Sequence, residues 1–345
     1  MTPASMTVAV CRAANHIHYE QVPVPQPAAD EVLVGIAYCG ICPSDFRVYD
    51  GRSPERLPLI LGHEFTGWVQ QVGSGVTRLR VGDRVVVNPA EPCYTHCPAC
   101  LRGLPNKCVH MHAGGGGGGL AQFRIARQSS VLQLKPNTDL IGASLAEPLA
   151  CVLHGQKRAH IRPGRLVVVV GSGPIGLLHL LSAKLAGARV IVSEPQPSRL
   201  AHAARLGADV TVDPTRRDLA EIVRSESGGW GADAVIVAVG SKTASEGAMR
   251  LLGMQGTLVL FAGMYPNVPL QLDSNLVHYS EISITGSSDY SHAEFVESVA
   301  LIERGLIDTT RLVSHVLPFD QIEQGMQIVR QASSLKVVIE VSGPP

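Results

Sequence analysis

A glycine turn between a buried strand and a long helix constrains the fold of this 345-residue chain more than any other feature. The segment RLVVVVGSGPIGLLHLLSAKLAG carries a G-x-G-x-x-G pattern directly after its apolar strand. The first glycine permits a tight turn, the second lets the backbone approach a pyrophosphate, and the third lets helix and strand pack closely. The amino end of a helix also attracts phosphate charge. The residues expected to contact a dinucleotide are Gly171, Gly173, Pro174, Ile175 and Gly176.

An acidic residue, Glu194, ends the next expected strand, 18 residues after Gly176. Such a carboxylate accepts hydrogen bonds from ribose hydroxyls and repels a 2′-phosphate. We therefore expect NAD to be preferred. Ser193 and Arg199 could instead support NADP, which we regard as the weaker alternative, and Arg199 is kept among the cofactor-binding candidates.

The pattern of apolar segments and turn residues along the chain divides it into two expected domains. Between about residues 154 and 286, continuous apolar strands alternate with helical segments, which predicts a parallel sheet covered on both faces. Residues 1–153 read as short strands between turns, and 287–345 as a mixed tail that rejoins them. The fold class is therefore α/β. The glycine run 114–119 is expected to be a flexible connection.

Six of the eight cysteines fall into two local groups, one made of Cys39 and Cys42 and the other of four cysteines between residues 93 and 108. Such grouping indicates metal ligation in a reducing compartment. Cys93, Cys97, Cys100 and Cys108 lie in one short loop with little apolar material, and supply the four thiolates of a structural zinc. His96 is an alternative ligand, and incidental free thiols are the other alternative.

A second candidate metal group is dispersed along the chain. Cys42 stands in Cys-Pro-Ser-Asp, His63 and Glu64 follow a glycine, and Glu147 precedes Pro-Leu. One thiolate, one imidazole and carboxylates from separate segments suit a catalytic zinc with an open position.

Charge and hydropathy exclude other classes of partner. The formal net charge is zero and no basic run stands out, so neither nucleic acid nor an anionic membrane is expected. The amino terminus lacks the features of a signal peptide, and the longest apolar stretch contains His179 and Lys184. We expect a cytoplasmic protein that acts on a small molecule.

The motifs YCGICPSDFRVYDG, LGHEFTGWVQQVGSGV, VGDRVVVNP, CPACLRGLPNKC, AEPLA and VVVVGSGPIGLL resemble the zinc-containing medium-chain alcohol dehydrogenases, especially their polyol and sorbitol branch. They occur in the same order through nearly the whole chain. The resemblance implies a GroES-like catalytic domain built from both chain ends, a Rossmann domain between them, and homodimers or homotetramers formed through the Rossmann sheets.

The resemblance also assigns roles within the dispersed group. Cys42 and His63 match the first two zinc ligands, and Glu64 the adjacent carboxylate, which ligates zinc or lies just behind it. Glu147 matches the polyol-branch carboxylate at the third ligand position, with Cys151 as the alternative thiolate.

Two further polar residues follow Cys42. Ser44 matches the hydroxyl that relays the alcohol proton, and Asp45 the carboxylate that orients the ligating histidine.

Three departures from the family pattern affect these expectations. The cysteine loop has one extra residue between Cys93 and Cys97. Arg47 stands where a histidine often continues the proton path. Asp289 stands where polyol enzymes often carry a substrate-binding arginine; we count Arg47 and Asp289 as candidate substrate residues, although Asp289 could instead face solvent or cap a helix.

The sequence thus predicts a zinc-dependent, NAD-linked dehydrogenase that reversibly oxidises a secondary alcohol of a polyol, sugar or cyclitol. An aminocyclitol is included if Asp289 faces the substrate. The alternatives are a threonine-type amino-acid alcohol dehydrogenase, a catalytically silent zinc-binding relative, and a zinc-ribbon nucleic-acid module.

Overall fold

The chain divides into two compact units in this computed structural model, which describes residues 2–111, 117–331 and 334–343. One unit is Met1–Pro148 with Ser291–Pro345, and the other is Leu149–Tyr290. The sequence placed these limits at 153/154 and 286/287. Gly114, Gly115 and Gly116 of the expected glycine connection lie outside the described residues. No described helix is long and apolar enough to span a bilayer.

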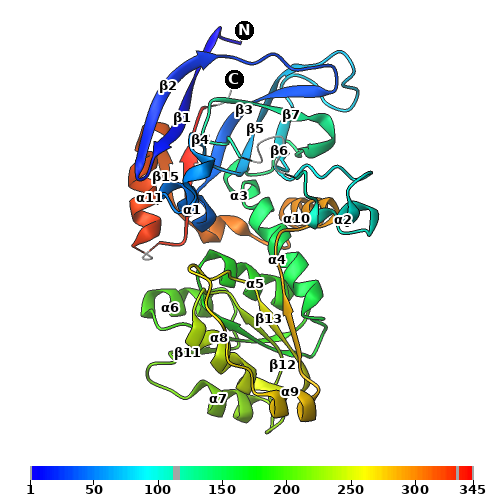
Figure 1. Cartoon of the computed structure of the whole chain (residues 1–345), viewed down its shortest axis with the longest axis vertical. Helices are drawn as coiled ribbons and strands as arrows, with labels where there is room; N and C mark the ends of the chain where they lie inside the picture. Colours follow the sequence, from blue (N-terminus) through cyan, green and yellow to red (C-terminus); the bar gives the residue numbers. More distant parts are fainter. Residues whose placement is uncertain (1, 112–116, 332–333, 344–345) are drawn as a thin grey trace. The chain divides into compact units, whose positions relative to one another are not determined.

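The unit 149–290 is built on a six-stranded parallel sheet (Figure 1). Its strands are β9 (Leu166–Val170), β10 (Arg189–Ser193), β11 (Val210–Val212), β12 (Ala232–Val237), β13 (Leu252–Leu260) and β14 (Ser283–Gly286). Their spatial order is β11-β10-β9-β12-β13-β14, so the direction of winding reverses between β9 and β12. This is the doubly wound order in which ligands bind outside the carboxyl ends of the central strands.

Helices alternate with these strands along the chain. They are α5 (Pro174–Leu185), α6 (Pro197–Arg205), α7 (Leu219–Glu226), α8 (Lys242–Ala248) and α9 (Ser274–Ser280). The central strand β9 reads LVVVV, and its first four residues are buried. Such a run has no polar face because helices cover both sides of the sheet. The predicted parallel sheet is confirmed.

The unit 1–148 with 291–345 is mainly antiparallel. A three-stranded sheet contains β2 (His16–Pro23), β1 (Ser5–Ala13) and β4 (Leu59–Ile60), in that order. A larger sheet runs β15-β16-β3-β5-β6-β8, with β7 also paired to β3. Its strands are β3 (Glu31–Gly40), β5 (Glu64–Val72), β6 (Arg84–Val87), β7 (Phe123–Arg127), β8 (Val131–Gln133), β15 (Val313–Pro318) and β16 (Lys336–Glu340).

The carboxyl-terminal part of the chain is built into this larger sheet. Strand β16 pairs antiparallel with β3, with Val338 opposite Gly40, and β15 lies parallel to β16. The helices of this unit are α1 (Phe46–Tyr49), α2 (Pro98–Leu101), α3 (Leu140–Ala143), α10 (His292–Glu303) and α11 (Ile322–Arg330); α4 (Ala146–Arg158) begins here and continues past residue 148. Residues from both chain ends, including Ile36, Phe65 and Met326, form one apolar core.

A histidine is buried within the parallel-sheet unit. His179 on α5 is fully buried, and its ring lies edge-on to Phe261 with the ring centroids 4.6 Å apart. Its Nδ1 is 3.2 Å from the side-chain amide of Gln156, and its Nε2 has no hydrogen-bond partner among the described residues. Burial disfavours the imidazolium and lowers the pKa of His179 to about 3.

This burial predicts a specific loss of stability in acid. An unfolded histidine takes up its proton below about pH 6.5, whereas folded His179 stays neutral until about pH 3, so folding is progressively weakened between these values. Between pH 7 and 5 the loss is about 2 kcal/mol. His179→Gln should remove it, as measured by urea unfolding of wild type and variant at both pH values. His278→Gln, at an exposed position on α9, is the matched control. An unchanged pH dependence in His179→Gln would contradict the assignment.

Candidate metal and nucleotide sites

Three of the expected metal-binding residues come together at the ends of neighbouring strands. Cys42 follows β3, and His63 and Glu64 lie where the adjacent strand β5 begins. The potential ligand atoms of Cys42, His63 and Glu64 all lie within 4.8 Å of one another. Backbone pairing of Gly40 with Glu64 holds these strand ends together. The antiparallel register therefore converts residues some twenty positions apart into one group.

The imidazole of His63 is held from both of its nitrogens. Its Nδ1 lies 3.4 Å from the carboxylate of buried Asp45, and its Nε2 lies 3.4 Å from the hydroxyl of Ser44. Asp45 in turn accepts hydrogen bonds from the backbone amides of Cys42 and Gly62. A carboxylate on one ring nitrogen orients the other nitrogen toward a metal position.

Electrostatics within this group follow from burial and charge. Burial acts to lower the pKa of His63, but the charges of Asp45 and Cys42 outweigh it and raise this pKa well above its ordinary value. For Asp45 burial acts to raise the pKa, and the charge and hydrogen bonds around it lower it overall. The hydroxyl of Ser44 is exposed and donates to Cys42 Sγ at 3.3 Å.

Lys336 is a component of the group that sequence reasoning missed. Its ammonium forms an ion pair with the carboxylate of Glu64, and the two residues are 4% and 1% exposed. Burial acts to lower the pKa of Lys336, but the charges of Glu64 and its neighbours outweigh it and raise this pKa. Apart from Lys336, neither carboxylate oxygen of Glu64 has a described partner. The available signal was a lysine opening the apolar strand KVVIE.

The remaining expected residues lie elsewhere. Glu147, in the first turn of α4, is partly buried and lies outside the group of three, although its charge contributes to the raised pKa of Lys336. Arg47 is exposed on α1. Asp289 is exposed, has a left-handed backbone (φ 57°), and accepts a hydrogen bond from the Ser288 hydroxyl at 3.1 Å. It is not the cap of α10, because Ser291 occupies that position.

The four loop cysteines form a second group. Their sulfur atoms all lie within 4.8 Å of one another, and His96 is not part of the set. Backbone amides point at the sulfurs: that of Cys93 donates to Cys108 Sγ at 3.2 Å, and that of Cys100 to Cys97 Sγ at 3.4 Å. Burial acts to raise the pKa of Cys93, but backbone hydrogen bonds outweigh it and lower this pKa to about 5. For Cys100, burial and the neighbouring thiols raise the pKa to about 12. Four sulfurs are the number of ligands that a tetrahedral structural zinc requires, and their mutual distances allow them to share one metal ion.

The glycine turn has the features expected of a nucleotide site. Gly171 has a left-handed φ of 95°, and a side chain at Gly176 would overlap the carbonyl oxygen of Gly171. The carboxylate of Glu194 accepts hydrogen bonds from the backbone amides of Ser172 and Gln196, at 2.8 and 3.0 Å. This carboxylate therefore lies directly beside the turn that precedes α5.

Arg199 on α6 lies near the same turn. Its guanidinium is 3.9 Å from the position that a Cβ of Gly173 would occupy. The turn thus has one acidic and one basic side chain beside it.

Comparison with known proteins identifies both parts of the chain. Residues 28–136 match the family of the alcohol dehydrogenase GroES-like domain, and residues 174–304 match the zinc-binding dehydrogenase family. The sorbitol dehydrogenase of Halalkalibacterium halodurans is 31% identical over 329 residues, 94% of this chain and 96% of that protein. The D-arabitol-phosphate dehydrogenase of Enterococcus avium is 33% identical over 324 residues, 92% of each chain.

A solved structure agrees with these relatives. A zinc-binding dehydrogenase from Sinorhizobium meliloti bound to NADP superposes with a TM-score of 0.92 at 28% identity, covering 98% of this chain and 100% of that one. The predicted α/β fold, with a GroES-like domain and a doubly wound parallel sheet, is confirmed. The chain belongs to the zinc-containing medium-chain alcohol dehydrogenases, within their polyol dehydrogenase branch.

Proposed function

We propose that this enzyme reversibly oxidises a secondary alcohol of a polyol, sugar or cyclitol to the ketone, with NAD as the hydride acceptor. The observation that carries the proposal is the group of Cys42, His63 and Glu64, whose sulfur, nitrogen and oxygen ligand atoms lie within 4.8 Å of one another. Relatives that act on sorbitol and on arabitol phosphate support the substrate class.

The donor set fits a catalytic zinc. Thiolate, imidazole and carboxylate are the ligands that zinc takes in dehydrogenases and hydrolases. We assign Cys42 and His63 as ligands, since their ligand atoms lie together with that of Glu64. The family resemblance supplies Glu147 as the third ligand, and Glu64 either completes the zinc shell or lies just behind it. Lys336 neutralises Glu64, so a thiolate and the Glu147 carboxylate would supply the two negative charges that balance Zn²⁺. When bound, the metal supplies Lewis-acid polarisation of the alcohol oxygen.

The proton of the alcohol leaves through Ser44 in this proposal. Its hydroxyl lies 3.3 Å from Cys42 Sγ and 3.4 Å from His63 Nε2, and the residue is exposed. A hydroxyl so placed accepts a proton at the metal group and passes it to solvent. Asp45 acts through His63, which it orients.

The nucleotide is assigned to the glycine turn of the other unit. Gly171, Gly173 and Gly176 with Pro174 and Ile175 approach the pyrophosphate, and Glu194 accepts from the ribose hydroxyls. NADP remains the alternative because Arg199 lies near the turn and the Sinorhizobium meliloti relative is bound to NADP. The bound dinucleotide supplies the hydride acceptor.

Asp289 gives one specific reason to keep amino-bearing substrates in view. Its exposed carboxylate can accept hydrogen bonds from hydroxyls or pair with an ammonium group. Aminocyclitols and threonine are therefore the alternatives to a neutral polyol. A panel of sorbitol, arabitol, arabitol phosphate, inositol, an aminocyclitol and threonine, assayed for NADH formation, distinguishes these classes; no turnover of any of them would favour a silent relative.

We further propose that two or four copies associate through the parallel sheet. Strand β14 is one of the two edge strands of this sheet, with β11 at the other edge, and it pairs only with β13 among the described strands. Ile284 on this edge is 40% exposed, and an open strand edge offers backbone groups for pairing with a second copy. Sedimentation of the purified enzyme as a monomer would rule out this assembly.

Removing a proposed zinc ligand should abolish turnover and preserve nucleotide binding. Cys42→Ser and His63→Ala should each lower kcat/KM at least a hundredfold, since metal polarisation is worth several kcal/mol. NADH affinity, measured by fluorescence, should stay within about twofold. Cys151→Ser is the matched control and should retain activity. Turnover above about a tenth of wild type in Cys42→Ser, or its loss in Cys151→Ser, would contradict the ligand set.

Replacing the buried ammonium of Lys336 should destabilise the unit formed by residues 1–148 and 291–345. Lys336→Met keeps the length of the side chain and leaves the Glu64 carboxylate buried without its counter-charge, a loss of about 3–5 kcal/mol in unfolding free energy. Lys184→Met removes a partly exposed ion pair with Asp209 and should cost at most about 1 kcal/mol. Thermal unfolding of both variants measures the difference. A loss of about 1 kcal/mol or less in Lys336→Met would contradict the stabilising role of the buried ion pair.

Cofactor choice should depend on Glu194. Glu194→Ser removes an acceptor of the ribose hydroxyls and a charge that repels the 2′-phosphate, so kcat/KM should fall about tenfold with NAD and rise with NADP. Glu221→Ser, at an exposed acid on α7, controls for net charge. A wild-type enzyme that prefers NADP would refute the assignment of NAD.

A further inference from the structure

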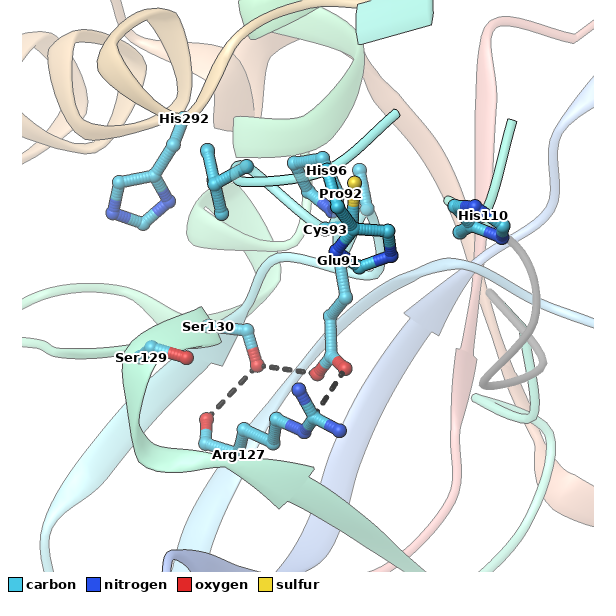
Figure 2. A pocket seen from close by; sticks show the side chains of 11 residues that line it. Glu91, Pro92, Cys93, His96, His110, Arg127, Ser129, Ser130 and His292 are labelled. Atoms are coloured by element: carbon cyan, nitrogen blue, oxygen red, sulfur yellow. Dashed lines mark hydrogen bonds and ion pairs between the residues drawn. The ribbon is translucent and has the colours of Figure 1, made fainter. Parts of the chain in front are cut away.

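A cavity of about 470 Å³ opens beside the four-cysteine group (Figure 2). Cys93, His96 and His110 line one part of it, and Glu91 and Arg127 another. The proposed dehydrogenase mechanism uses none of its histidines. The cavity lies wholly within the unit 1–148 with 291–345.

Two imidazoles face each other at this cavity. The ring centroids of His96 and His110 are 5.1 Å apart, with the ring planes tilted by 41°, and both residues are exposed. Two imidazoles bound to one tetrahedral metal through bonds of about 2.0–2.1 Å have centroids about 5 Å apart. The observed separation therefore already matches that of a bis-imidazole metal site.

The surroundings of the pair favour ligation. The Thr95 hydroxyl donates to the Cys93 carbonyl at 3.0 Å and lies 3.2 Å from Nδ1 of His96. Its oxygen can therefore accept from Nδ1–H, and this tautomer leaves Nε2 as the ligand atom. The backbone of His110 is anchored, because its amide donates to Cys108 Sγ at 3.3 Å. The cysteine group is complete without either histidine, since its own four sulfurs lie within 4.8 Å of one another.

The acidic and basic side chains of the lining lie beside each other. Figure 2 shows the Glu91 carboxylate turned toward Ser130 and Arg127. It accepts from the Ser130 hydroxyl at 2.8 Å and lies 4.0 Å from the Arg127 guanidinium, whose positive charge it offsets. The third histidine of the lining, His292, is engaged with the Asn88 side chain at 3.2 Å.

We propose that His96 and His110 bind a divalent transition metal at a third metal site, distinct from the cysteine group, with water completing the coordination. Imidazole suits nickel, copper and zinc. The site does not depend on the proposed substrate or cofactor.

A second pair of neighbouring histidines provides the control. The rings of His16 and His18, on β2, have centroids 4.3 Å apart and are nearly perpendicular, at 72°. His16 Nδ1 also lies 3.5 Å from the Glu323 carboxylate. This pair lines no part of the cavity.

Calorimetric titration with Ni²⁺ tests the proposal on the whole enzyme, after loosely held metal has been removed and the resident zinc counted. His96→Gln and His110→Gln should each weaken Ni²⁺ binding at least about tenfold, by loss of one of two protein ligands. His16→Gln should bind as wild type does, and resident zinc and turnover should be unchanged in all three variants.

Three outcomes would overturn the assignment. Ni²⁺ affinity could be unaltered in both cavity variants, or it could be lost in His16→Gln instead. Resident zinc could also fall in His96→Gln or His110→Gln, which would show that the histidines serve the cysteine group rather than a separate metal.

Discussion

The unit formed by residues 1–148 and 291–345 depends on the antiparallel pairing of β16 with β3, which joins the two ends of the chain in one sheet. This register places Lys336 against Glu64 in a setting from which both side chains are almost excluded from water. A buried carboxylate is costly unless a counter-charge reaches it. A side chain at Gly40 would overlap the Glu64 carboxylate and crowd Lys336. A glycine at this end of β3 therefore leaves room for the ion pair between Lys336 and Glu64.

The two candidate metal groups are assembled in different ways. The cysteine group is local, with all four sulfurs from one short loop and backbone amides directed at them. That loop has only a small apolar cluster of its own around the cysteines, so metal binding and local folding are expected to be coupled. The residues of the Cys42 group come from the ends of two paired strands. Their positions are set by a sheet that is stabilised by its own apolar core rather than by the group itself.

In the parallel-sheet unit, separate residues shape the glycine turn. Gly176 permits the close approach of α5 to the turn, and Gly171 takes a backbone conformation that side chains disfavour. The carboxylate of Glu194 accepts hydrogen bonds from two backbone amides at the turn. A carboxylate fixed in this way is preorganised, so the proposed binding of ribose hydroxyls would need less ordering of its side chain.

Features that depend on neighbours in the chain could be derived from the sequence by itself. The glycine turn, the cysteine loop and the alternation that predicts a parallel sheet all encode contacts over a few residues or one repeated period. The tertiary structure alone decided that Lys336 reaches Glu64, that His96 faces His110 rather than joining the cysteines, and that Glu147 stays outside the group of three. These contacts depend on sheet register and loop path, because residues far apart in the chain meet only once the strands between them are paired.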